Sequence, residues 1–133
     1  MRILVVDDQL SVRLICRMYF EESDLDVEIL EAASGEAAVQ ILDTEHVDVV
    51  LSDHRMGPTT GLEVLVHALH HQPHALRCMM SGYADPELAE AAATKAKVHA
   101  FIEKPMGAPA MEELLEREIA SRYLRPALAD SRR

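Results

Sequence analysis

The chain alternates short apolar runs with longer stretches whose apolar residues recur at helical spacing. Short, continuous aliphatic runs are typical of strands buried on both faces of a parallel sheet. The central run, residues 47–51, is of this kind, whereas the second run alternates imperfectly and is typical of an outer strand. The predicted strands cover residues 3–6, 27–32, 47–52, 76–80 and 98–102.

Five helices are predicted after these strands, from apolar residues that recur every three or four positions. Ser34 is the expected N-cap of the second helix, and Asp85 that of the fourth, with Pro86 at the first helical position. Pro73 marks the end of the third helix. The predicted helices cover residues 11–22, 35–44, 61–71, 86–96 and 109–124.

Strands that alternate with helices imply parallel βαβ units with right-handed crossovers. The sequence therefore predicts an α/β fold, a doubly wound five-stranded parallel sheet with strand order 2-1-3-4-5 and five helices. The 133 residues suffice for one domain. We expect it over residues 1–125, with 126–133 as a C-terminal tail or the start of a linker, and the chain either stands alone or is part of a longer protein.

Composition narrows the classes of function. A net charge of -10 and a pI near 5.0 argue against direct binding of nucleic acid by this domain. No apolar run approaches the ~20 residues of a membrane span, and Met1 leads directly into a strand without a signal peptide, so a cytoplasmic protein is expected. Cys16 and Cys78 lack metal-ligand spacing and are expected to be buried, reduced thiols. Neither the G-x-G-x-x-G nor the Walker motif of nucleotide-binding proteins is present.

Polar residues follow four of the predicted strands. Asp7 and Asp8 come after the first strand, Asp53 after the third, Ser81 after the fourth and Lys104 after the fifth. Because these strands are contiguous in the predicted order, their carboxyl ends meet at one edge of the sheet, where α/β proteins build their sites. A single acid after a strand would be interpreted as a turn residue. Together, the three acids, the serine and the lysine predict a shallow pocket.

The chemistry of such a pocket favours phosphoryl transfer. Neighbouring carboxylates raise one another's pKa unless a cation intervenes, and an oxygen-rich site with open water positions suits Mg²⁺. Mg²⁺ would keep Asp53 ionised and nucleophilic, and with Lys104 it would neutralise the phosphoryl oxygens. Ser81 would donate a hydrogen bond to one of these oxygens, and Gly82 lets the backbone approach closely.

These residues resemble the receiver domain of two-component response regulators, a flavodoxin-like fold. The similarity rests on V-V-D-D at residues 5–8, D-x-x-M from Asp53 with Gly61 eight positions later, S-G at 81–82 and F-x-x-K-P at 101–105. The motifs occur in the family's order, each at a predicted strand end, and span residues 3 to about 124.

The resemblance implies a role for each matching residue. Asp53 is the phosphoacceptor, charged from a phosphohistidine of a sensor histidine kinase or phosphotransfer protein. Asp8 is a direct Mg²⁺ ligand beside Asp53, with Asp7 binding through water or supporting it, and the backbone carbonyl of Arg55 is a further ligand. Lys104 binds the phosphoryl group.

The resemblance also implies a conformational switch. On phosphorylation, Ser81 moves towards the phosphoryl group and Phe101 rotates into the space it leaves. The Lys104–Pro105 bond is expected to be cis, as in the family. The switch would act on an output domain or a partner protein, and surplus apolar surface on the fourth and fifth helices is available for a homodimer. Residues 81–86 resemble receivers joined to cyclic-di-nucleotide phosphodiesterase domains.

The chain departs from the family beside the phosphoacceptor. Gly57, followed by Pro58, stands where the family usually has proline, so the loop is expected to be more mobile or to take another turn. His54 replaces an aliphatic residue, and strand alternation is expected to point it away from Asp53 as a packed, neutral histidine.

Four further residues are expected to border the pocket. Arg55 and Tyr83 stand two positions after the acid and the serine, where the family tunes the loss of the phosphoryl group. Gly82 and Pro105 stand beside the serine and the lysine.

Histidines cluster at the end of the third helix. His67 and His71 are four residues apart on one face, and His70 and His74 are near. A zinc site needs three or four converging ligands, and no acidic or cysteine partner stands at ligand spacing in this segment. A solvated helix end is therefore expected.

Three functions compete. The leading hypothesis is a phosphorylation-dependent switch that catalyses only its own phosphorylation and dephosphorylation and is not an enzyme for a free substrate. The alternative is a non-cycling receiver-like protein-interaction scaffold, which the intact Asp8, Asp53 and Lys104 argue against. A hydrolase with an aspartyl nucleophile would need a D-x-D signature at a strand end and a cap insertion, and the sequence has neither.

Overall fold

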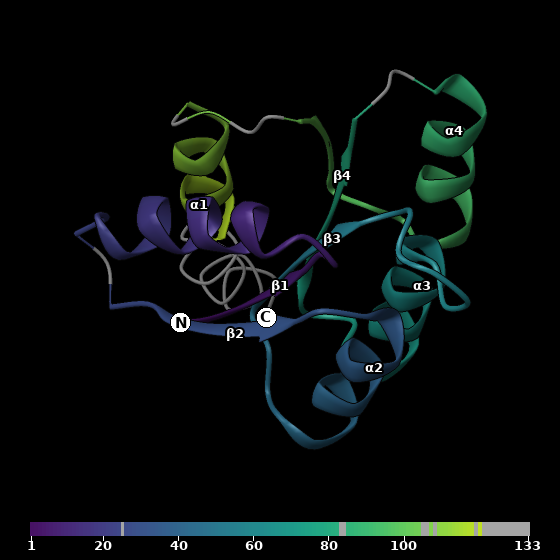
Figure 1. Ribbon diagram of the computed structural model, residues 1–133, viewed down its shortest axis with the longest axis horizontal. Helices are drawn as coiled ribbons and strands as arrows, with labels where there is room; N and C mark the ends of the chain where they lie inside the picture. Colours follow the sequence, from purple (N-terminus) through teal and green to yellow (C-terminus); the bar gives the residue numbers. More distant parts are fainter. Residues whose placement is uncertain (25, 83–84, 105–106, 108, 119, 121–133) are drawn as a thin grey trace, which may run out of the picture.

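The computed structural model describes residues 1–24, 26–82, 85–104, 107, 109–118 and 120. Five parallel strands form one sheet in the order β2-β1-β3-β4-β5, which confirms the predicted doubly wound topology (Figure 1). The strands are β1 (Arg2–Val6), β2 (Glu28–Ala32), β3 (Val49–Asp53), β4 (Leu76–Ser81) and β5 (Ala100–Glu103).

Helices alternate with the strands as predicted. The Oγ of Ser34 and the Oδ1 of Asp85 each accept a hydrogen bond of 3.1 Å from a backbone N–H three residues later, which confirms both predicted N-caps. The expected end of the last helix at residue 124 and the tail 126–133 lie outside the described residues. The helices are α1 (Leu10–Glu21), α2 (Gly35–Thr44), α3 (Gly61–His71), α4 (Pro86–Lys95) and a helical segment at residues 109–118.

The sheet separates two apolar layers. On one face, β1 residues Leu4 and Val6 pack with α2, α3 and α4; on the other, Ile3 and Val5 pack with α1 and the segment 109–118 (Figure 1). Strand residues alternate between the faces, so a central strand covered on both sides has to be apolar throughout. All five residues of β3 are buried, as its sequence predicts.

Two strands, β3 and β5, begin two residues later than predicted. The backbone N–H of Val47 donates to the side chain of Gln72 at 2.8 Å, and β3 begins only at Val49. The N–H of Val98 donates to the carbonyl of Ala92 at 3.3 Å, so residue 98 belongs to the turn that closes α4. The apolar pattern shows neither the distant side chain of Gln72 nor the turn that closes α4, so it extends both strands too far.

Both cysteines are buried and unpaired, as expected. Burial raises the pKa of Cys16 to about 11 and that of Cys78 to about 12. Both thiols are therefore protonated at neutral pH and belong to the packing of the core rather than to a reactive site.

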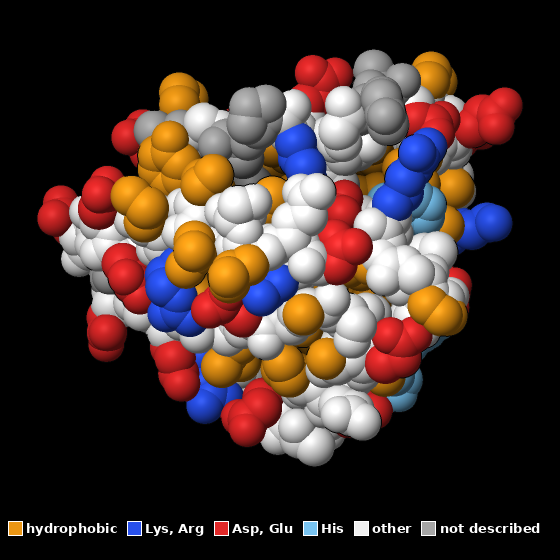
Figure 2. Space-filling model, in the orientation of Figure 1, with side chains coloured by type: hydrophobic (Ala, Val, Ile, Leu, Met, Phe, Trp, Pro, Cys, Tyr) orange, Lys and Arg blue, Asp and Glu red, His pale blue; other side chains and the backbone are white. Residues whose placement is uncertain are grey.

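Helix α1 presents more apolar surface than the sheet covers. Cys16 and Phe20 are buried, but Ile15, which precedes Cys16 in the helix, is 43% exposed. Figure 2 shows hydrophobic side chains gathered over α1. None of the described helices has the length and apolar content needed to cross a membrane. The exposed apolar side chains of α1, named here the α1 patch, are Leu10, Leu14, Ile15 and Met18.

Candidate functional site

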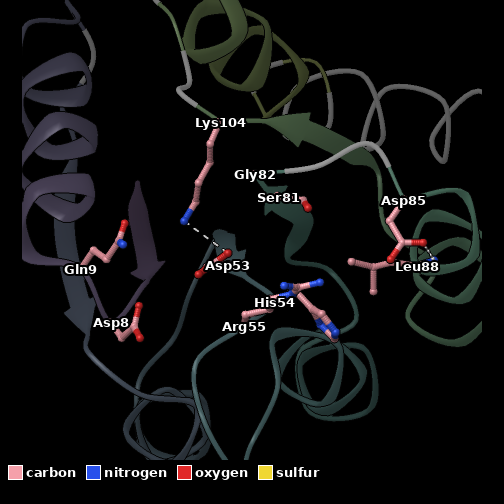
Figure 3. Close-up of a pocket in the computed structure, with 10 residues that line it drawn as sticks. All are labelled: Asp8, Gln9, Asp53, His54, Arg55, Ser81, Gly82, Asp85, Leu88 and Lys104. Atoms are coloured by element: carbon pink, nitrogen blue, oxygen red, sulfur yellow. Dashed lines mark hydrogen bonds and ion pairs between the residues drawn. The ribbon is translucent and has the colours of Figure 1, made fainter.

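A pocket of about 520 Å³ opens at the carboxyl edge of the sheet, where β1, β3, β4 and β5 end (Figure 3). The structure thus brings together residues that are far apart in the chain, as the strand order predicts. The lining residues expected from the sequence are Asp8, Asp53, Arg55, Ser81, Gly82 and Lys104, and those not expected are Gln9, His54, Asp85 and Leu88.

Lys104 connects two carboxylates at the centre of the site. Its Nζ lies 2.6 Å from Oδ2 of Asp7 and 3.2 Å from Oδ1 of Asp53, the second contact being drawn in Figure 3. Asp7 is fully buried and Asp53 is 8% exposed, so water screens these charges poorly. The ammonium therefore holds both acids at hydrogen-bonding distance on the inner side of the pocket.

Burial sets the protonation chemistry of this pair. It raises the pKa of Asp53, and the charge of Asp7 adds to the rise while Lys104 opposes it. Burial alone would lower the pKa of Lys104, but the hydrogen bond to Asp7 and the charge of Asp53 outweigh it and raise that pKa. Lys104 is thus held as an ammonium, whereas the ionised form of Asp53 is disfavoured and would gain from a further cation.

A network behind the pocket fixes Asp7. Its Oδ1 accepts a hydrogen bond of 2.9 Å from the backbone N–H of Gln9, and Arg13 donates to its backbone carbonyl at 2.7 Å. Arg13 and Arg17 of α1 both pair with Glu31 of β2, at 3.1 and 2.6 Å. The pKa of Glu31 is lowered, and the hydrogen bond from Arg17 is the largest cause. Sequence reasoning missed this network, although two arginines four apart on one helix face were its visible signal.

Three carboxylates are placed to share a cation. Asp7, Asp8 and Asp53 each offer an oxygen, and these atoms lie within 4.8 Å of one another. A hard, all-oxygen donor set with one exposed member matches Mg²⁺, which keeps several waters. Such an ion would supply the positive charge that the buried carboxylate of Asp53 needs in order to stay ionised. Arg55 lines the pocket, and the role of its backbone carbonyl as a ligand stays a prediction.

Beyond β3 the chain returns so close to the end of that strand that only glycine fits at residue 61. The N–H of Gly61 donates to the carbonyl of His54 at 2.9 Å, and a Cβ on Gly61 would lie 1.8 Å from the carbonyl oxygen of Asp53. A side chain there would displace the end of β3 and with it the carboxylate. This approach is the physical reason for a glycine eight positions after Asp53.

Gly57 gives the intervening loop its direction. Its φ is 120°, a backbone conformation that glycine adopts far more readily than other residues. Proline, whose φ is fixed at about -65°, would not follow this path. The loop therefore takes a different turn from the one that proline would impose, as the sequence suggested.

Ser81 and Phe101 stand on neighbouring strands. Ser81 is 7% exposed at the end of β4 and lines the pocket. Phe101 of β5 is partly buried against the apolar layer that faces α2, α3 and α4. Their movement as a switch pair stays a prediction. Tyr83 and Pro105, with the expected cis bond, lie outside the described residues.

His54 is half-buried as expected, but it also lines the pocket. Because β3 ends at Asp53, strand alternation no longer fixes the direction of the next side chain. Its Nδ1 is buried, and no group in the described part of the chain makes a hydrogen bond to it. Asp85 and Leu88 come from the start of α4 and were missed because sequence reasoning treated them only as helix residues.

Comparisons with known proteins identify this arrangement. The family model for the response regulator receiver domain matches residues 3–116. Chemotaxis protein CheY of Listeria monocytogenes is 31% identical over 117 residues, which cover 88% of this chain and 97% of CheY. The hydrogenase transcriptional regulatory protein HoxA of Cupriavidus necator is 32% identical over 103 residues, 77% of this chain and 21% of HoxA, so the chain spans about a fifth of that relative.

The crystal structure of a CheY-like response regulator receiver domain protein from Methanospirillum hungatei JF-1 is also similar. It shares 26% sequence identity with a TM-score of 0.82, and the match covers 91% of this chain and 95% of that one. The likeness therefore extends over most of both chains.

Proposed function

Because this chain belongs to the response regulator receiver domain family, we propose that Asp53 accepts a phosphoryl group from a phosphohistidine. The donor would be a sensor histidine kinase or a phosphotransfer protein. The phosphorylated domain would change conformation and control an output domain or a partner protein. The observation that carries the proposal is the placement of Lys104 Nζ, 2.6 Å from Asp7 and 3.2 Å from Asp53.

In the proposed reaction, a carboxylate oxygen of Asp53 attacks phosphorus. An O–P bond forms, the P–N bond to the donor histidine breaks, and the imidazole leaves with the bonding electron pair and takes up a proton. The ammonium of Lys104 already lies beside Asp53 and would stabilise the negative charge that develops on the phosphoryl oxygens. Mg²⁺ held by Asp7, Asp8 and Asp53 would neutralise further charge on these oxygens.

Loss of the phosphoryl group would also belong to the domain itself. Water would attack phosphorus, the O–P bond to Asp53 would break, and inorganic phosphate would leave with Asp53 restored as a carboxylate. The residues that line the pocket, Arg55 and Gly82 among them, would control the access of this water. The domain would thus catalyse its own phosphorylation and dephosphorylation without turning over a free substrate. A domain with this role would work in the cytoplasm, beside the catalytic domains of its kinase.

Ser81 is the proposed sensor of the phosphoryl group. It ends β4 inside the pocket, and the neighbouring strand β5 carries Phe101. A hydrogen bond from Ser81 to a phosphoryl oxygen would draw the end of β4 inwards and open space for the ring of Phe101. The packing between β4, β5 and α4 would then differ between two states, which a partner can distinguish.

The α1 patch supports docking of the phosphodonor protein. Leu10 is 58% exposed and Met18 is 60% exposed, and Leu10 directly follows Asp8 and Gln9 of the pocket. A donor that packs against this patch would bring its phosphohistidine over Asp53. A homodimer through α4 and the last helix is the second assembly that we propose to test.

The proposal is tested by intact mass after incubation with a small phosphodonor and Mg²⁺. We expect a Mg²⁺-dependent gain of one phosphoryl group in the wild type and none in Asp53→Asn. No gain in the folded wild type with two different donors would favour the alternative, a scaffold that binds partners without cycling phosphate. Co-purification of the same partner with wild type and Asp53→Asn would then identify that scaffold.

A further inference from the structure

A second group of metal-binding side chains lies on α2 and α3. Asp43, His67 and His71 each offer a ligand atom, and these atoms lie within 4.8 Å of one another. The sequence alone places His67 and His71 on one helix face without a third ligand. The tertiary structure supplies it, because α2 packs beside α3 and brings Asp43 to the same place.

The three side chains already converge on one point. Nε2 of His67 lies 2.7 Å from Oδ1 of Asp43, and the rings of His67 and His71 stack with centroids 3.9 Å apart and an interplanar angle of 16°. Zinc bonds of about 2.0 to 2.1 Å in a tetrahedron separate the ligand atoms by roughly 3.3 Å. An ion would therefore have to replace the proton that Nε2 of His67 shares with the carboxylate of Asp43. It would also have to open the contact between these two atoms by roughly half an ångström.

The tautomer of His71 is set for metal binding. Its Nδ1 lies 3.0 Å from the backbone carbonyl oxygen of His67. A carbonyl only accepts hydrogen bonds, so Nδ1 carries the proton and Nε2 keeps the lone pair that a metal needs. Histidines that bind metals usually hold their second ring nitrogen in a hydrogen bond of this kind.

The donor atoms select the metal. Two imidazoles and one carboxylate suit a borderline-soft ion such as Zn²⁺, whereas the all-oxygen group of Asp7, Asp8 and Asp53 suits Mg²⁺. Histidines four residues apart on a helix are also a recurring pair of zinc ligands. We propose that Asp43, His67 and His71 form a Zn²⁺ site whose fourth ligand is water.

The proposed site is separate from the phosphoacceptor pocket. Helix α3 begins at Gly61 against Asp53, and its two histidines follow six and ten residues later. At about 1.5 Å per residue, they lie about 9 to 15 Å along the helix axis. Zn²⁺ would thus join α2 to α3 and stabilise the fold without entering the pocket, so this proposal does not depend on phosphorylation.

The experiment is calorimetric titration of the full chain with Zn²⁺ in saturating Mg²⁺, which occupies the acidic pocket. We expect one Zn²⁺ per chain in the wild type. His71→Ala and His67→Ala should each weaken Zn²⁺ binding by at least about tenfold. Loss of a group that only supports a metal ligand already has an effect of this size, and loss of the ligand itself should have a larger one. His70→Ala is the matched control, because His70 is exposed on the same turn and is not among the three ligands.

Three results would overturn the proposal. One is no Zn²⁺ binding by the folded wild type. Another is equal Zn²⁺ affinity in His71→Ala and the wild type. The third is loss of Zn²⁺ binding in Asp53→Asn while both histidine variants still bind Zn²⁺, which would place the ion in the acidic pocket. Circular dichroism of each variant confirms folding. Thermal unfolding with and without Zn²⁺ gives a second readout, whose shift should be larger for His70→Ala than for His71→Ala.

Discussion

At the scale of single residues, the candidate site depends on one ammonium group placed between two acids. Asp7 is fully buried, so its charge requires a partner, and Lys104 supplies one at 2.6 Å. The same Nζ lies 3.2 Å from Asp53, where the proposed reaction builds up negative charge. Lys104 therefore links the stability of the pocket to its chemistry.

Replacing Lys104 tests this link. Lys104→Met keeps much of the apolar stem but removes the charge, and we expect phosphorylation of Asp53 by a small donor to slow by about a hundredfold, the usual loss for one stabilising donor. The rate is measured by intact mass over time. Lys104→Arg, which keeps the charge, should retain part of the rate. An unchanged rate in Lys104→Met would contradict the assigned role.

Gly61 is the second residue whose identity the fold dictates. A Cβ on Gly61 would meet the carbonyl oxygen of Asp53 at 1.8 Å, whereas one on Gly82 would meet no atom of the described residues within 4 Å. We expect Gly61→Ala to lower the free energy of unfolding by about 1 to 3 kcal/mol, as for an overpacked site, and Gly82→Ala to change it little. Urea denaturation compares the two, and equal stabilities would refute the close-approach argument.

At the scale of elements, the two faces of α1 differ in what they contact. Its inner face buries Cys16 and Phe20 against the sheet, and Arg13 holds the end of β1 at the pocket. Its outer face leaves the α1 patch in solvent. Exposed apolar patches of this kind mark interaction surfaces, and this one adjoins the pocket that contains Asp53.

We therefore expect Leu14→Gln to slow phosphotransfer from a phosphorylated donor protein by about tenfold, the effect of losing about 1.4 kcal/mol of docking energy. Phosphorylation by a small donor should not change. Ala93→Gln, at an exposed position on α4, is the control. If Ala93→Gln slows transfer and Leu14→Gln does not, the donor docks at α4 instead.

At the scale of the whole molecule, the buried acid opposes folding. Burial raises the pKa of Asp53 in the folded protein, so the folded state holds a proton on Asp53 more tightly than the unfolded chain does. Protonation of Asp53 therefore stabilises the fold in acid, and this contribution is lost as the pH rises through the folded-state pKa. Around neutral pH the ionised carboxylate destabilises the protein.

The expected consequence is that Asp53→Asn is more stable than the wild type at pH 7 without Mg²⁺. Its advantage should shrink as the pH falls towards about 3.9, the ordinary pKa of aspartate, because the wild-type carboxyl then becomes neutral too. Mg²⁺ should narrow the difference at pH 7 by stabilising the wild type. Thermal unfolding across this range measures it. A less stable Asp53→Asn at pH 7 would mean that the pair with Lys104 outweighs burial.

The sequence by itself determined the order of the elements and the main residues of the pocket. Apolar runs mark strands that are covered on both faces, and capping residues such as Ser34 and Asp85 act on their own helix, so both signals are local. The parallel order follows from the alternation of elements, and it brings Asp53, Ser81 and Lys104 to one edge. These features required no knowledge of distant contacts.

Only the tertiary structure decided which groups meet across elements. The contact of Lys104 with Asp7, the close approach of Gly61 to the carbonyl of Asp53, and the place of His54 in the pocket all arise where separate segments pack. Asp43 joins His67 in the same way, 24 residues apart in the chain. Hydrogen bonds, ion pairs and van der Waals contacts act over a few ångströms, so these partners are set by packing and not by spacing along the sequence.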